Sequence, residues 1–99
     1  MSQQTTGDSP TLLQFFATWC RPCKVLSPIV DAIETKMSTQ LQVARVNIDE
    51  EEGLTSRFQI MAVPTLVLMK NNQEIWRHTG VLSESNLKTA LESALSAQP

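Results

Sequence analysis

The sequence predicts one α/β domain with the element order βαβαββα, built on a four-stranded mixed sheet with helices on both faces. Three observations predict this fold class. Strand-like apolar runs at about 11–17 and 41–48 alternate with segments that have the apolar spacing of a helix. A third run, at 64–70, is followed by an Asn-Asn turn and a further strand-like segment. The chain has 99 residues, which is enough for one domain with one core.

The first helix is expected over about 21–38, because apolar residues recur there at spacings of three and four. These positions are Val25, Leu26, Ile29, Val30, Ile33 and Met37. Pro22 fits an early helical position, where its missing N–H costs little, and Pro28 should kink the helix. The strand–helix–strand unit around this helix should be parallel and right-handed.

The middle of the chain is interpreted as a strand followed by a short helix. The apolar run 41–48 predicts a buried strand. Asp49 and Glu52, three residues apart, then indicate a helix start with Asp49 as its cap. In that helix Leu54 and Phe58 fall on one face, which should pack on the sheet.

The last third of the chain predicts a hairpin and a helix. The run 64–70 is expected to return through the turn Asn71-Asn72 into an antiparallel strand at 74–79. Ser83 is expected to cap a final helix at about 84–96. The buried stripe of this helix consists of Leu87, Leu91, Ala94 and Leu95.

Composition and charge exclude several classes of function. The 8 basic and 10 acidic residues give a net charge of -2, so no basic patch indicates nucleic acid or an anionic membrane. No apolar run approaches the roughly 20 residues that span a bilayer, and residues 1–7 lack the cationic start and apolar stretch of a secretory signal. We expect a cytoplasmic monomer, with a flexible or loosely helical segment at 1–9 and the domain at 10–99.

The two cysteines carry the chemistry that the sequence predicts. Cys20 and Cys23 stand two residues apart, after a predicted strand and at the start of a predicted helix. Thiols at this spacing can close a small disulfide ring. A helix start offers unpaired N–H groups and the positive end of the helix dipole, both of which favour the reactive thiolate. Strand, CxxC and helix together indicate disulfide exchange.

A metal clip and a pair of inert buried thiols are the alternative interpretations. A tetrahedral zinc site needs four thiolate or imidazole ligands, and beyond the cysteines the chain offers only His78. We therefore expect no metal site, and we expect His78 to be a solvated surface residue.

Five features carry a resemblance to the thioredoxin family over about residues 11–96. They are the stretch from Phe15 to Lys24 around the cysteines, Pro28 in the first helix, the strand from Val43 to Asp49 with its acidic end, the tripeptide Val63-Pro64-Thr65, and Gly80. A lone CxxC is weak evidence, whereas all five features in this order are specific.

The resemblance implies a thiol–disulfide oxidoreductase that reduces the disulfides of partner proteins. Cys20, at the helix start and nearest to solvent, would be the nucleophile, and Cys23 would resolve the mixed disulfide. A cis bond would precede Pro64. The extended segment of the partner would be held by Trp19, Ala62, Val63, Pro64 and Gly80. No bound cofactor is implied beyond the redox-active disulfide itself, and an NADPH-dependent thioredoxin reductase would return electrons to it.

Three departures from the family pattern qualify this expectation. Arg21 stands where the family has glycine, and Gln14 replaces a buried acid, so Arg45 should lack a partner and behave as a surface cation. The family's first strand has no counterpart, so four strands are expected rather than five.

The groups expected to modulate the cysteines are Arg21, Pro22, Gln14, Lys24, Arg45 and Asp49. Arg21 and Gln14 also keep open a disulfide oxidase or isomerase, and a non-catalytic binding subunit is the remaining alternative.

Overall fold

The computed structural model describes residues 9–97, and the element order in that range is βαβαββα, as predicted. The elements are β1 (Thr11–Phe16), α1 (Arg21–Lys36), β2 (Gln42–Asn47), α2 (Glu52–Arg57), β3 (Thr65–Lys70), β4 (Gln73–Thr79) and α3 (Glu84–Ser96). The sequence places these elements to within a few residues. Of the segment expected to be flexible or loosely helical, only Ser9 lies within the described residues.

The strands form one mixed sheet in the order β2-β1-β3-β4. β1 lies in the interior of the sheet, where it pairs in parallel with β2 and antiparallel with β3. β3 and β4 form the predicted antiparallel hairpin. Its turn residues Asn71 and Asn72 have φ values of 54° and 65°, a left-handed conformation that asparagine tolerates better than most residues.

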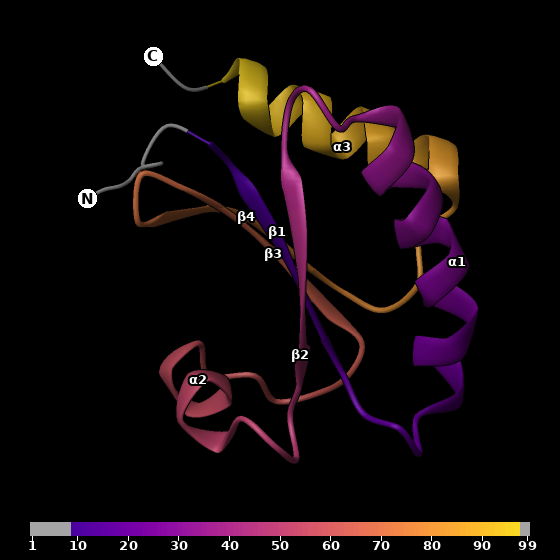
Figure 1. Cartoon of the computed structure of the whole chain (residues 1–99), viewed down its shortest axis with the longest axis vertical. Coiled ribbons are helices and arrows are strands. Elements are labelled where there is room, and N and C mark those ends of the chain that lie inside the picture. The colour runs from indigo at the N-terminus through magenta and orange to yellow at the C-terminus, as the bar shows by residue number, and fades with distance from the viewer. Residues whose placement is uncertain (1–8, 98–99) are drawn as a thin grey trace.

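Helices cover both faces of this sheet (Figure 1). α1 and α3 pack on one face, over a core that includes Leu12, Leu26 and Leu91. α2 lies on the other face, where Leu54 and Phe58 pack against a cluster around the fully buried Phe15. β1 therefore contributes side chains to both layers, and its C-terminal end leads directly into the CxxC segment.

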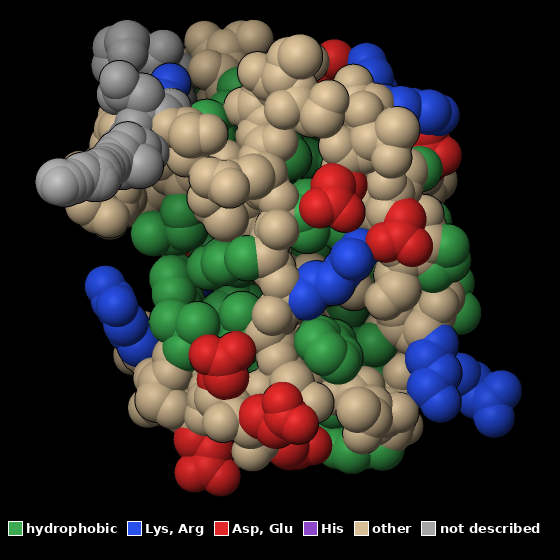
Figure 2. Space-filling view, viewed as in Figure 1, with side chains coloured by type: hydrophobic (Ala, Val, Ile, Leu, Met, Phe, Trp, Pro, Cys, Tyr) green, Lys and Arg blue, Asp and Glu red, His purple; other side chains and the backbone are tan. Residues whose placement is uncertain are grey.

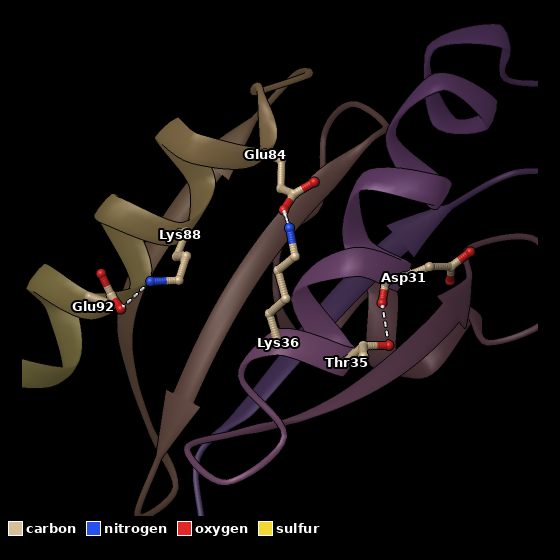
Figure 3. A network of polar contacts seen from close by, with 6 residues as sticks. All are labelled: Asp31, Thr35, Lys36, Glu84, Lys88 and Glu92. Carbon is tan, nitrogen blue, oxygen red and sulfur yellow. Dashed lines mark hydrogen bonds and ion pairs between the residues drawn. The ribbon is translucent and has the colours of Figure 1, made fainter.

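Polar contacts also tie the two helices of the larger layer together (Figure 3). Lys36 near the end of α1 forms an ion pair with Glu84 at the start of α3. On α3 itself, Lys88 Nζ lies 2.7 Å from Glu92 Oε2. Ser83 caps α3 as predicted, since its Oγ accepts from the N–H of Asn86 at 3.1 Å. Such exposed ion pairs contribute little each, so the apolar core carries most of the helix packing.

Two local expectations were wrong. β2 is an edge strand in which only Val46 is buried, because its sole neighbour in the sheet is β1. The short helix begins at Glu52, and no side chain caps it. Asp49 is therefore not its cap. Its carboxylate instead accepts a hydrogen bond from Trp19, 30 residues away in the sequence, as described below.

Arg77 on β4 forms an ion pair within its own strand and a hydrogen bond to the end of α2. Arg77 donates to both carboxylate oxygens of Glu74 at 2.8 Å and to the carbonyl oxygen of Phe58 at 2.8 Å. The hydrogen bond from Arg77 holds the pKa of the Glu74 carboxyl below its ordinary value, against a smaller opposing effect of burial. A carboxyl whose pKa is lowered on folding stabilises the fold above its ordinary pKa. That contribution is lost as pH falls through the lowered pKa.

Candidate functional site: the Cys20–Cys23 disulfide

Cys20 and Cys23 form a disulfide at the start of α1, with their Cα atoms 5.3 Å apart. β1 ends at Phe16, and a turn closed by the Cys20 N–H on the Ala17 carbonyl at 3.2 Å delivers Cys20 to the N-cap position. There its Sγ accepts the N–H of Cys23 at 3.2 Å. The first sulfur thus takes the place of a capping oxygen, at the end of the helix where partial positive charge gathers.

The two cysteines differ in their position on α1 but hardly in their burial. Cys20 and Cys23 are 4% and 2% exposed, so the expected advantage of Cys20 in solvent access is small. Cys20 alone lies at the N-cap and receives the N–H bond, whereas Cys23 lies inside the first turn. A thiolate at Cys20 would keep that bond and strengthen it, because hydrogen bonds to charged acceptors are stronger than neutral ones.

Trp19 and Asp49 lie together beside the disulfide. The indole Nε1–H of Trp19 donates to Asp49 Oδ2 at 2.9 Å, while the ring remains 68% exposed. β1 and β2 are parallel, so their C-terminal ends reach the same edge of the sheet and bring these two residues together. Both residues were expected at the site, but their contact was not predicted from the sequence.

The loop before β3 forms the other side of the site. Val63 packs against the small cluster of Ala17, Cys20 and Cys23, and the Val63–Pro64 bond is cis. Two contacts fix this loop: Thr65 Oγ1 donates to the Ala62 carbonyl at 2.7 Å, and the Gly80 N–H donates to the Pro64 carbonyl at 2.9 Å.

The backbone of Val63 and the open space at Gly80 are both available to a partner chain. Within residues 9–97, neither the N–H nor the C=O of Val63 forms a hydrogen bond. Gly80 has a φ of +106°, which L-residues rarely adopt, and an added Cβ would meet only a His78 atom at 3.9 Å. Its conformation requires glycine, and the space beside it is open.

A series of hydrogen bonds that starts at the buried Gln14 takes the place of the family's buried acid. Gln14 is fully buried, and its Oε1 accepts from Arg45 Nε at 2.8 Å while its Nε2 donates to Ser27 Oγ at 3.3 Å. Arg45 Nη2 lies 2.6 Å from Asp31 Oδ1. The expectation that Arg45 lacks a partner was therefore wrong. The contact between Arg45 and Gln14 could have been predicted, because the two residues stand opposite each other in the parallel pairing of β1 and β2. The contacts with Ser27 and Asp31 could not, because they depend on how α1 packs on the sheet.

The two cations of the CxxC segment, Arg21 and Lys24, are exposed. Neither Arg21 nor Lys24 forms an ion pair with any residue between 9 and 97. Together with Trp19 and Val25 they line a surface cavity of about 420 Å³. Pro22 occupies an early helical position in the same turn, as predicted.

A second cavity, which was not predicted from the sequence, lies on the α2 side of the site. Its volume is about 650 Å³, and it is lined by Ile48, Glu52, Thr55, Ser56, Gln59, Ile60 and Met61. Met61 is 93% exposed, which is unusual for a large apolar side chain. The sequence marks Met61 only by its place shortly before Pro64.

The part of the chain that the structure describes, residues 9–97, contains neither a metal-binding cluster nor a membrane-spanning helix. No cluster of three or more His, Cys, Asp or Glu side chains there is arranged to hold a metal ion. None of its helices combines the length and the apolar character that crossing a membrane requires.

Comparison with known proteins identifies clear relatives. The sequence model of the family described as Thioredoxin matches residues 2–93. "Thioredoxin Y, chloroplastic" from Oryza sativa subsp. japonica is 34% identical over 89 residues, which cover 90% of this chain and about half (53%) of that protein. "Thioredoxin" from Mycobacterium tuberculosis (strain H37Rv) is 33% identical over 90 residues, covering 91% of this chain and 78% of the relative. "Thioredoxin" from Alicyclobacillus acidocaldarius is 33% identical over 93 residues, covering 94% and 89%.

Proposed function

The chain belongs to the thioredoxin family, and we propose how its residues carry out the protein disulfide reduction that family membership and the close cysteine pair support. The observation that carries the proposal is the position of Cys20 Sγ at the N-cap of α1, where it accepts the N–H of Cys23. The oxidase, isomerase and non-catalytic alternatives are not favoured by these relatives.

The reaction is a dithiol–disulfide exchange in two steps. The Cys20 thiolate attacks one sulfur of a partner disulfide, a Cys20–partner bond forms, and the second partner sulfur leaves as a thiolate. The Cys23 thiolate then attacks Cys20 Sγ, which forms the Cys20–Cys23 disulfide and releases the first partner sulfur. Two electrons pass from the protein to the partner, and the partner thiolates take up protons from the two cysteines or from water.

The partner is held by backbone pairing beside the disulfide. The N–H and C=O of Val63, which form no hydrogen bond within residues 9–97, can pair with an extended segment by β-like hydrogen bonds. The cis Pro64 and the hydrogen bond from Thr65 to the Ala62 carbonyl keep the loop in position. Trp19 supplies an exposed apolar ring on one side, and the open space at Gly80 admits the partner backbone on the other.

Electrons must then return to the disulfide from outside the chain. We propose an NADPH-dependent thioredoxin reductase as their source, a cytoplasmic monomer as the working form, and residues 10–99 as the functional domain. Thioredoxins act through the redox-active disulfide and need no bound cofactor, so the Cys20–Cys23 pair is the sole electron carrier in this account.

Insulin reduction coupled to a redox titration tests the proposed function. The pre-reduced protein should catalyse the reduction of insulin disulfides by dithiothreitol, and the Cys20–Cys23 pair should titrate against glutathione as one two-electron couple. A protein that never accelerates insulin reduction, or a pair that does not titrate between dithiol and disulfide, would contradict the proposal.

Replacing Arg21 with glycine should make the cysteine pair less oxidising. The Arg21 guanidinium lies next to Cys20 and favours its thiolate, and therefore the dithiol form. Because Arg21 is exposed, solvent screening limits the shift to about 20 mV, or about 1 kcal/mol or less. Titration against glutathione measures the shift. Arg21→Gln separates charge from helix propensity, and a potential unchanged in both variants would show that Arg21 does not act on the thiolate.

Replacing Gln14 with aspartate should lower the reduction potential and speed the resolving step. Ser27, which bonds to Gln14, lies one helical turn after Cys23, so residue 14 lies under the face of α1 that carries Cys23. A carboxylate there opposes thiolate formation and can accept the Cys23 proton, whereas the amide of Gln14 cannot. We expect a shift of about 30 mV, which is about 1.4 kcal/mol for this couple.

The matched control is Gln14→Asn, which shortens the side chain equally without adding charge. Potential and the rate of release from the mixed disulfide are measured for both variants. Equal behaviour of the aspartate and asparagine variants would show that charge at residue 14 does not reach the cysteines, because Arg45 neutralises it.

A further inference from the structure

Charge is divided between the two sides of the exposed Trp19 ring. Arg21 and Lys24 lie on one side, at the start of α1. The acidic run from Asp49 to Glu52 lies on the other, between β2 and α2, with Asp49 bonded to the indole itself. Figure 2 shows basic side chains protruding at the lower right, where α1 begins, and acidic side chains gathered at the lower left, over α2.

These charges are free to interact with a partner. All six side chains are exposed, and none forms an ion pair within the described range 9–97. The acidic group comprises Asp49, Glu50, Glu51 and Glu52. Each side also has a cavity. The cavity on the basic side is lined by Trp19, Arg21, Lys24 and Val25. The cavity on the acidic side is lined by residues that include Glu52, Ile48 and Met61. A partner segment that crosses Cys20 therefore meets a different cavity at each of its ends. One end meets the apolar cavity that carries two cations, and the other meets the apolar cavity that carries a carboxylate.

We propose that this site selects protein disulfides by the charge order of the attacked segment, with an acidic side chain on the flank that meets Arg21 and Lys24 and a basic or apolar one on the flank that meets Asp49 to Glu52. The inference deepens the proposed disulfide reductase function and rests on it. Backbone pairing with Val63 sets the direction in which an extended segment lies, so the two flanks of the attacked cysteine are not equivalent. Charge order along the segment decides reactivity, and net charge does not.

Exposed ion pairs are individually weak, but here attraction in one order is replaced by repulsion in the other. Two attractive contacts, one on each flank, therefore become two repulsive contacts when the order is reversed. At low ionic strength we expect a ratio of roughly fivefold in the second-order rate constant of reduction between segments of opposite order, which falls toward one as salt screens the charges.

The test uses two symmetric peptide disulfides of identical composition. In one, each chain has the order Glu-Ala-Cys-Ala-Lys, and in the other Lys-Ala-Cys-Ala-Glu, so mass, net charge and thiol content are the same. The pre-reduced full chain is mixed with each disulfide at low salt and quenched with acid, and the free peptide thiol is then separated from the protein and measured. One order should react roughly five times faster than the other. Equal rates for the two orders would overturn the proposal.

Variants assign the preference to the cationic side. Arg21→Gln with Lys24→Gln should reduce the ratio between the two orders at least twofold. Because the ratio is taken within one variant, effects of Arg21 on the Cys20 thiolate cancel. Lys88→Gln, on α3 and outside the lining of the cavity, removes the same kind of charge and should leave the ratio unchanged. An unchanged ratio in the double variant would overturn the assignment to Arg21 and Lys24.

A third peptide disulfide separates this inference from the proposed function. It carries alanine in place of Glu and Lys. If the disulfide reductase function fails, none of the three peptides is reduced. If only the charge preference fails, all three are reduced at the same rate.

Discussion

The Cys23→Ser variant should become covalently attached to its partners, whereas Cys20→Ser should lose disulfide reduction almost completely. Cys20 can still attack a partner disulfide when Cys23 is absent, but no second thiolate is placed to release the product. Without Cys20, the nucleophile at the N-cap is gone, and a serine hydroxyl is not ionised near neutral pH. The rate should fall by roughly a thousandfold or more. Mass spectrometry of protein mixed with a disulfide peptide counts the trapped adducts.

The comparison of the two single variants is the control. Both have one cysteine and the same number of atoms, so a difference in trapping reports position and not thiol content. Equal trapping by both variants, or more by Cys20→Ser, would contradict the assignment of Cys20 as the attacking residue.

Phe15→Ala should cause a large loss of stability, of about 3–5 kcal/mol. Phe15 is fully buried on the α2 face of the sheet, and its ring centroid lies 5.6 Å from that of Phe58 at an interplanar angle of 55°. Truncation would leave a cavity between β1 and α2 and remove this aromatic contact. Since small domains are stable by roughly 5–15 kcal/mol, urea unfolding of the oxidised protein should show a much lower midpoint.

Phe58→Ala is the matched control, because it removes the same ring contact from a partly buried position. Its loss should be clearly smaller than that of Phe15→Ala. If Phe15→Ala loses less than about 1 kcal/mol, the cluster under α2 is not packed as described.

Most of the fold could be predicted from the sequence because its signals are local. Helix spacing in α1, the Asn71-Asn72 turn and the Ser83 cap each depend on residues close together in the chain, and each was placed correctly. The burial of β2, by contrast, could not be predicted from local sequence signals. An apolar run shows that a strand has a buried face, but whether the strand lies at the edge depends on strand order.

The polar details of the site were missed for the same reason. Asp49 bonds to Trp19, 30 residues away, and Arg45 pairs with Asp31, 14 residues away on α1. Helix-start statistics favoured Asp49 as a cap because they consider only the next few residues. Tertiary packing, which no short sequence window contains, also produces the cavity lined by Trp19 and the cavity lined by Met61. The same holds for the backbone of Val63, which forms no hydrogen bond within residues 9–97.

A single-turnover mass balance tests the central claim most directly. Equal amounts of pre-reduced protein and a disulfide protein are mixed, quenched with acid at intervals, alkylated and digested. The account predicts that a mixed disulfide at Cys20 appears first and then decays. One Cys20–Cys23 disulfide should form for each partner disulfide that is reduced. A mixed disulfide that maps to Cys23, or partner reduction without formation of the Cys20–Cys23 bond, would contradict the account.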